Sequence, residues 1–357
     1  MNHARAAALS LLALASCAAP RPGPAEPPAI TRAPRCTPPD RRAALDAFVA
    51  QRRPAYTTAL GKARAFLDSL AVDPIALRTV RIKGKKKLTE ALDAYYRLYL
   101  VAPPEGRAAI LARVEELARP TREDRYHDML LISDSQLKED ATSYLRAALL
   151  LDRMGVDIAR YREGINRAQG RLDAQMKDRG PHQRRAFHTY YQHFGLREPF
   201  ALEGALTQGL IARRADPDKL SRLDVYGVTH EIFAAYDFGD RLDADAFGDD
   251  DRAYLRLALP KLVGAWRRAK DPDLVAELVS CLRLVQQTDL PSYLDGIEHL
   301  LSSQNADGSW GSYEVMRARL GEHVKQGFYL HTTMVVIDAL TYGFEDLYRK
   351  GEGPVCG

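Results

Sequence analysis

The stretch that decides the fold is Gln304-Asn305-Ala306-Asp307-Gly308-Ser309-Trp310-Gly311. It follows a run from Tyr293 to Leu301 whose apolar residues recur every three or four positions, as in an amphipathic helix. Asp307-Gly308 favours a turn, because glycine tolerates a positive φ. The last carbonyls of a helix have no intrahelical partner. Gln304 can therefore bond across to a neighbouring helix end, and Trp310, one of two tryptophans in the chain, can cover the pair.

The rest of the body carries the same helical periodicity beyond Asp40, without sustained alternation of apolar and polar residues. Proline and glycine mark the breaks between helices. The predicted helices are Asp40–Phe48, a second from about Pro54 to Asp73-Pro74, Leu88–Val101, Glu105–Ala118, Asp134–Met154, Ile158–Asp178, His182–Phe194, Pro199–Arg213, Leu220–Asp237, Asp250–Ala269, Pro272–Gln287, Pro291–Ser303 and Phe328–Tyr348.

Short loops between these helices predict a single all-α domain over residues 41–357, built from antiparallel helical hairpins. The segment from Gly296 to Gly311 resembles the Gln-Trp motif of the terpenoid cyclases and protein prenyltransferases. That resemblance implies an α/α toroid, a closed double ring of helices around a central cavity, in which Gln304, Asp307, Gly308 and Trp310 are structural. An irregular α-solenoid is the alternative.

The chain departs from the catalytic patterns of both families. The acidic stretch from Asp243 to Asp251 lacks the Asp-x-Asp-Asp spacing with which the cyclases protonate their substrate. Ser280 and Val279 precede Cys281, so the Asp-x-Cys zinc pair of the prenyltransferases is absent as well. The resemblance therefore implies a fold and leaves the reaction open.

The N-terminus predicts export. Arg5 precedes an apolar run too short to span a bilayer, which is typical of a signal peptide over residues 1–16. Leu14-Ala15-Ser16-Cys17 resembles a bacterial lipobox, which implies cleavage before Cys17 and lipidation of that cysteine. An ordinary signal peptide with an incidental cysteine is the alternative.

A proline-rich segment follows the predicted lipid anchor. Dense proline favours extended, solvated chain, so residues 17–40 are predicted to form a tether that holds the body away from a membrane. Ala18 and Ala19 stand where retention in the inner membrane would favour Asp. We therefore expect a lipid-anchored protein of the bacterial cell envelope at the outer membrane, with membrane lipid as a partner.

Composition argues against nucleic acid as a partner. The 357-residue chain has a formal net charge of +4, and without Arg5 of the signal 50 basic residues stand against 47 acidic ones. A nearly neutral body gives no electrostatic basis for binding nucleic acid.

Two of the four cysteines are candidates for a disulfide. Cys17 is the predicted anchor and Cys281 lies in an apolar helix, which leaves Cys36 and Cys356 at the two ends of the body. An exported protein meets an oxidising compartment. The toroid implied by the resemblance has neighbouring first and last helices, so ring closure predicts that Cys36 and Cys356 pair.

Two histidines in apolar helices are candidates for a site. His230 and His331 each precede an aspartate by seven residues, Asp237 and Asp338, and so share a helix face with it, about 10 Å apart along the axis. Glu277 lies between them in the sequence, on a helix face flanked by leucines, where a carboxylate needs a partner. His230, Asp237, Glu277 and His331 are therefore the catalytic candidates.

Three interpretations of these residues stay open. His230, Glu277 and His331 can form a His₂-carboxylate site for a divalent metal such as zinc. They can also be core histidines hydrogen-bonded to acidic neighbours, or part of a metal-free polar pocket that binds a ligand or performs acid–base chemistry.

The sequence also leaves three classes of function open. An envelope enzyme and a binding lipoprotein both need a cavity for a small molecule, peptide or glycan. A non-catalytic scaffold lipoprotein needs only its outer helices. The sequence favours a function based on a cavity and does not decide whether the protein is an enzyme.

Overall fold

The computed structural model describes residues 36–70, 82–199, 202, 208–242, 246–311, 329–349 and 355–356. The predicted signal peptide, Cys17 and the tether up to residue 35 lie outside these ranges. The helices are α1 (Pro39–Ser69), α3 (Ile82–Val101), α4 (Pro104–Ala118), α5 (Asp134–Arg153), α6 (Ala159–Gln175), α7 (Pro181–Phe194), α9 (Arg222–Ala235), α10 (Asp249–Arg268), α11 (Pro272–Leu284), α12 (Pro291–Ser302), α14 (Leu330–Phe344) and α15 (Asp346–Arg349). Short 3₁₀ turns lie at Arg119–Arg122, Asp124–Tyr126, Met176–Asp178, Pro217–Lys219 and Asp237–Gly239.

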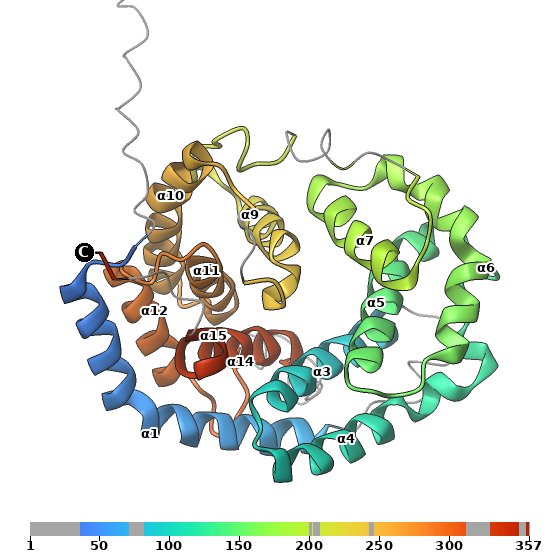
Figure 1. Ribbon diagram of the computed structural model, residues 1–357, viewed down its shortest axis with the longest axis horizontal. Helices are drawn as coiled ribbons and strands as arrows, with labels where there is room; N and C mark the ends of the chain where they lie inside the picture. Colours follow the sequence, from blue (N-terminus) through green and yellow to red (C-terminus); the bar gives the residue numbers. More distant parts are fainter. Residues whose placement is uncertain are drawn as a thin grey trace, which may run out of the picture. The chain divides into compact units, whose positions relative to one another are not determined.

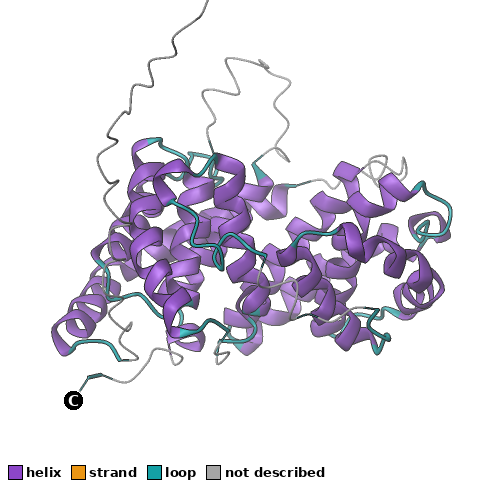
Figure 2. Ribbon diagram, turned by 90° about the horizontal axis from the view of Figure 1, so that it is seen from above, coloured by secondary structure: helices purple, strands orange, loops and turns teal. Residues whose placement is uncertain are grey.

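The all-α class is confirmed, and Figure 2 shows helices and loops throughout the described chain. Its only β-type pairing within those ranges is an isolated bridge between Thr37 and Val355. Helix starts follow the sequence signals, because Pro104, Pro181, Pro272 and Pro291 each occupy the first turn of a helix.

Several predicted boundaries were wrong: α3 begins at Ile82 instead of Leu88, and α14 ends at Phe344 instead of Tyr348. One helix, α1, runs from Pro39 through Pro54 to Ser69, where we predicted a break between Phe48 and Pro54. Position 54 lacks an N–H donor, yet the long apolar face of α1 holds the helix together against its neighbours. The helix predicted over Pro199–Arg213 does not extend to its predicted end, because residues 208–213 form turns; residues 200–201 and 203–207 lie outside the described ranges.

Six helices contact one another in sequence order, and the last contacts the first. The contacts run from α3 to α5, α7, α9, α11 and α14, and then from α14 back to α3. The remaining long helices pack on this set: α4 lies against α3, α6 against α5, α10 and α12 against α11, and α1 against α12 and α14 (Figure 1). The closed toroid itself remains a prediction.

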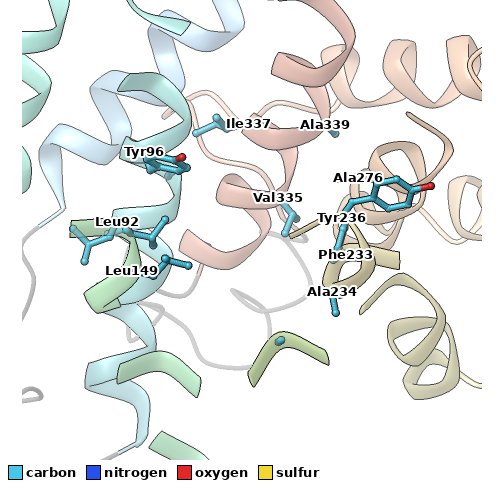
Figure 3. Packing of buried hydrophobic residues seen from close by; sticks show 14 of the residues in the cluster. Leu92, Tyr96, Leu149, Phe233, Ala234, Tyr236, Ala276, Val335, Ile337 and Ala339 are labelled. Atoms are coloured by element: carbon cyan, nitrogen blue, oxygen red, sulfur yellow. The ribbon is translucent and has the colours of Figure 1, made fainter. Parts of the chain in front are cut away.

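The hydrophobic core is shared by all these helices. Figure 3 shows Leu92 and Tyr96 of α3, Leu149 of α5, Phe233 of α9 and Val335 of α14 around one interior region. The buried side chains therefore come from segments far apart in the sequence, and helix packing rather than helix propensity holds the elements in place.

The Gln304–Gly311 turn joins α12 to α1. Gln304 Nε2 donates to the carbonyl of Ala59, 2.8 Å away in the middle of α1, and to the Gly308 carbonyl at 3.0 Å. Gly308 has φ +90° and approaches α1 so closely that a Cβ there would lie 2.2 Å from the Lys62 carbonyl oxygen. Trp310 is fully buried, and its Nε1 donates to the Leu300 carbonyl at 2.8 Å.

The two ends of the body meet. Cys36 and Cys356 form a disulfide with a Cα–Cα distance of 5.0 Å, and the Cys356 amide donates to the Thr37 carbonyl at 3.0 Å. Farther along α1, the Tyr56 ring stacks on the Phe344 ring of α14 with centroids 4.5 Å apart.

Candidate functional site

A cavity of about 70 Å³ lies among α3, α5, α9, α11 and α14. Its lining mixes five apolar or aromatic side chains with charged and hydroxyl-bearing ones, and a volume of this size can hold a few water molecules or one end of a ligand. The lining residues are Asp93, Arg146, His230, Phe233, Phe238, Glu277, Ser280, His331, Met334, Val335, Asp338 and Tyr342.

Helix α11 supplies the buried acid of the cavity. Asp271 caps the helix by accepting a hydrogen bond from the Leu274 amide at 3.2 Å, and every residue of α11 is buried. Positions 273, 277 and 280 are three or four residues apart, so Asp273, Glu277 and Ser280 share one face. That face points toward α9 and α14, because Glu277 and Ser280 line the cavity.

Helix α14 supplies an imidazole surrounded by carboxylates. His331 Nδ1 lies 3.0 Å from Oε1 of Glu90 on α3, and its Nε2 lies 3.6 Å from Asp273 Oδ1 and 3.8 Å from Glu277 Oε1. The His331 side chain is 33% exposed, whereas that of Glu277 is 1% exposed. A molecule in the cavity therefore meets the imidazole before it meets the carboxylate.

Opposing effects set the pKa of His331. Burial alone would lower the pKa of this imidazole, but the close contact with Glu90 and the charges of Asp273 and Glu277 outweigh burial and raise it to about 9. His331 is therefore a cation at neutral pH.

Burial has the largest effect on the pKa of Glu277. Loss of solvent, together with the nearby charge of Asp273, raises the pKa of Glu277 to about 8, although His331 and a hydrogen bond from the Thr229 hydroxyl act in the opposite direction. Asp273 in turn accepts a hydrogen bond from the Tyr226 hydroxyl. Helix α9 thus supplies the donors that hold both α11 carboxyls in position.

His230 on α9 has the opposite electrostatic character. Its Nδ1 lies 2.6 Å from the Tyr226 carbonyl oxygen, and its ring packs 5.6 Å from the His182 ring of α7. Burial lowers the pKa of His230, which keeps the imidazole neutral. The cavity therefore presents one neutral and one cationic histidine.

The structure brings His230, Glu277 and His331 together on one cavity, as the sequence analysis expected. Asp237 lies elsewhere: α9 ends at Ala235, Asp237 takes a positive φ of 47°, and its carboxylate pairs with Arg153 at 2.6 Å. The expected two-turn spacing to His230 is wrong because the helix stops before reaching Asp237.

The second aspartate does share a face with its histidine. Asp338 lines the cavity with His331 and pairs with the fully buried Arg97 at 3.0 Å. Burial raises the pKa of Asp338 to about 6, against the opposing charge of Arg97.

The metal site predicted on His230, Glu277 and His331 is not supported. Over the described ranges, no three His, Cys, Asp or Glu side chains are grouped so that they could hold a metal ion. The His230 Nδ1 lies 2.6 Å from the Tyr226 carbonyl oxygen, and this hydrogen bond occupies that nitrogen.

Sequence reasoning missed Glu90 and the charged pairs at the cavity wall. Glu90 lies between Leu88 and Ala91-Leu92, and Arg97 lies between Tyr96 and Leu98, so each is a charge within an apolar run. A charge within an apolar run indicates a buried ionisable group that needs a partner, and this signal was present in the sequence. Arg146 pairs with Asp93 at 3.0 Å in the same wall.

The fold and the cavity define an all-α protein with an interior acid–histidine site. The chain belongs to the family described as Domain of unknown function (DUF6895), which matches residues 58–339. No curated protein and no solved structure matches this chain. The matched range contains Glu90, His230, Asp273, Glu277 and His331, whereas Tyr342 of the cavity lining lies beyond it.

Proposed function

We propose that this protein is a lipid-anchored protein of the bacterial cell envelope whose central cavity binds and processes a small polar molecule. The observation that carries the proposal is the partly exposed His331, which faces a cavity while the acidic groups around it are buried. Charged groups in an interior cost folding free energy unless they are paired. A protein that needed only a stable interior would fill this region with apolar side chains.

An unsatisfied hydroxyl supports the same proposal. Ser280 is 1% exposed, lines the cavity, and its Oγ has no hydrogen-bond partner among the described residues. Buried polar atoms are rarely left without a partner. A ligand or an ordered water in the cavity would satisfy this hydroxyl.

The proposal includes an α/α toroid. Support comes from the order of helix contacts, which runs from α3 through α5, α7, α9, α11 and α14 and returns to α3, with the other long helices outside this set. The disulfide between the two ends of the body is consistent with closure. In such a ring the inner helices converge on the cavity that His230, Glu277 and His331 line.

The proposed location rests on the sequence around Cys17, which lies outside the described residues. The described helices are each too short or too polar to cross a membrane. We expect wild-type protein in the outer-membrane fraction and the Cys17→Ser variant in the soluble fraction after cell lysis. Retention of that variant in the membrane fraction through detergent-free washing would contradict the lipid anchor.

A methyl group in the cavity wall allows a test of ligand binding. Met334 lines the cavity, whereas Met176 is buried in the 3₁₀ turn after α6. In the full chain carrying Cys17→Ser, with ¹³C-methyl methionine, we expect millimolar glycerol or glucose to shift the Met334 resonance and leave that of Met176 in place. His331→Gln should abolish the shift.

The control for that experiment is His188→Gln on α7, which removes a histidine that pairs with Glu198 outside the cavity. This variant should respond to glycerol and glucose as the parent does. If neither compound moves Met334, the cavity does not admit molecules of this kind, and the alternative of a non-catalytic scaffold is favoured.

A further inference from the structure

We propose that His230 and His331 act as the general base and the general acid of a proton-transfer reaction on a neutral, hydroxyl-bearing molecule in the cavity. This inference rests on the proposed function and assigns the roles within its site. It follows from three features: the tautomer of His230, the carboxylate surroundings of His331, and the pairing of the other charges in the wall.

The tautomer of His230 is fixed by its neighbour. The Tyr226 carbonyl oxygen can only accept a hydrogen bond, and His230 Nδ1 lies 2.6 Å from it. The proton of the neutral imidazole therefore sits on Nδ1, which leaves Nε2 on the opposite ring edge with a lone pair. His230 lines the cavity, and its neutral imidazole can take a proton from a ligand.

Burial is the largest cause of the lowered pKa of His230, and the positive charges of His331 on α14 and Lys86 on α3 act in the same direction. The hydrogen bond to the Tyr226 carbonyl and the Asp273 carboxylate on α11 oppose these effects without reversing them. The His182 ring of α7 packs against the His230 ring.

The surroundings of His331 favour the protonated imidazole. Glu90 faces its Nδ1 from α3, and Asp273 and Glu277 face its Nε2 from α11 at 3.6 and 3.8 Å. Since the Glu90 and Asp273 carboxylates stabilise the cation, His331 holds a proton that it can deliver to a ligand oxygen. Two titratable groups in one site with opposed proton affinities are the arrangement that acid–base catalysis requires.

The other charges of the wall indicate a neutral ligand. Asp93 pairs with Arg146 at 3.0 Å, and Asp338 pairs with Arg97 at 3.0 Å. Each pair is neutral as a whole, and the Arg146 Nη1, which is buried without a hydrogen-bond partner, can donate to an uncharged ligand oxygen. The Ser280 hydroxyl, which is buried and unsatisfied, can donate to or accept from a ligand hydroxyl as well.

The reaction removes one proton from the ligand and returns one proton to it. One proton leaves an O–H or C–H group of the ligand for His230 Nε2, and His331 gives one proton to a second ligand oxygen. The net charge of ligand and site is unchanged: one C–H or O–H bond of the ligand breaks and one O–H bond forms, as in an isomerisation by proton transfer. The site resets when a proton passes from His230 through cavity water to His331.

Histidine NMR of the full chain carrying Cys17→Ser tests the assignment. At pH 7 we expect His230 to be neutral with its proton on Nδ1, and His331 to be cationic until the pH approaches 9. His230→Gln and His331→Gln assign the two signals, and His188→Gln is the control. A cationic His230, a proton on Nε2 of His230, or a neutral His331 at pH 7 would overturn the proposal.

Diethyl pyrocarbonate separates this proposal from the proposed function, because it acylates neutral imidazole nitrogens that it can reach. At pH 7 we expect carbethoxylation of His230 to be about a hundredfold faster than that of His331, which is protonated two pH units below its pKa of about 9. Equal rates would overturn the assignment of roles while leaving an open cavity. If NMR shows the expected charges but the reagent labels neither histidine, the cavity is closed to the reagent. That result would overturn both the processing of a ligand and the catalytic roles of the two histidines.

Discussion

A buried carboxyl and a buried imidazole couple the stability of this protein to pH. The pKa of Glu277 is about 8 in the folded chain against an ordinary value of 4.5, and the pKa of His331 is about 9 against 6.5. In both cases the folded chain holds a proton that the unfolded chain releases at neutral pH. Each group therefore contributes most to stability at low pH, and its contribution is lost as the pH rises. The loss occurs between pH 4.5 and 8 for Glu277 and between pH 6.5 and 9 for His331.

The Glu277→Gln variant tests this coupling. From pH 6.5 to 8, Glu277 alone should lower the free energy of unfolding of the parent by about 2 kcal/mol, since each pH unit is worth about 1.36 kcal/mol per proton. A glutamine side chain at this position cannot ionise and keeps the shape of the glutamate, so this part of the decline should vanish. Urea denaturation at both pH values measures it.

The matched control for that variant is Glu115→Gln, at an exposed position of α4. It should show the same decline with pH as the parent chain. If Glu277→Gln and the parent lose stability equally between pH 6.5 and 8, then Glu277 is already ionised in the folded chain, and its place in the acid–histidine site is wrong.

At the level of elements, α11 is the helix on which the cavity depends. It contacts α9, α10, α12 and α14, and all of its residues are buried. Its contact with α12 is close because Gly296 lies opposite Val279: a Cβ at position 296 would stand 2.3 Å from Val279 Cγ2. The position of Glu277 therefore depends on a small residue in another helix.

Gly296→Val should separate α11 from α12. Overpacking of a buried contact costs about 1–3 kcal/mol, and we expect a loss of that size in the free energy of unfolding, measured with urea. The variant should also weaken the response of Met334 to glycerol, because α11 carries one wall of the cavity.

Gly61→Ala in α1 is the comparison, since a Cβ at that position would meet nothing within 4 Å. Alanine at a compatible helical position should stabilise the protein by about 0.4–1 kcal/mol. A Gly296→Val chain as stable as the parent would show that α12 does not hold α11 in place.

At the scale of the whole molecule, three kinds of contact join the start of the body to its end. They are the Cys36–Cys356 disulfide, the stacking of Tyr56 on Phe344, and the hydrogen bond from Gln304 to the Ala59 carbonyl. All three link α1 or its start to the C-terminal helices across more than 200 residues of sequence. They tie α1 to the C-terminal part of the body, which includes the cavity helix α14.

Replacing both cysteines by serine should destabilise the body. The disulfide spans a sequence separation of 320 residues, and the chain-entropy model gives such a link at most about 6 kcal/mol. We expect a lower urea midpoint for the Cys36→Ser/Cys356→Ser chain, and an equal shift when the parent is reduced. Cys281→Ser, at the buried free cysteine, controls for the loss of a thiol. Free thiols at positions 36 and 356 in the parent, detected by non-reducing peptide mapping, would contradict the link.

The sequence by itself determined the all-α class, most helix boundaries, and three of the residues that meet at the cavity, His230, Glu277 and His331. Apolar spacing and proline or glycine breaks act over a few residues, so they can be read locally. A polar residue within an apolar helix, such as His230, Glu277 or His331, can be identified from the sequence as one that needs a partner, because burial without a partner is costly.

Only the tertiary structure decided which partner each of these residues has. Glu90 meets His331 from a helix about 240 positions earlier, and Asp237 pairs with Arg153 instead of following His230 along α9. The continuous α1 across Pro54 was likewise settled by packing against α12 and α14. Local periodicity fixes where a helix forms and which face is apolar. The pairing of charges and the end of a helix such as α9 depend on contacts between distant segments, which no local pattern encodes.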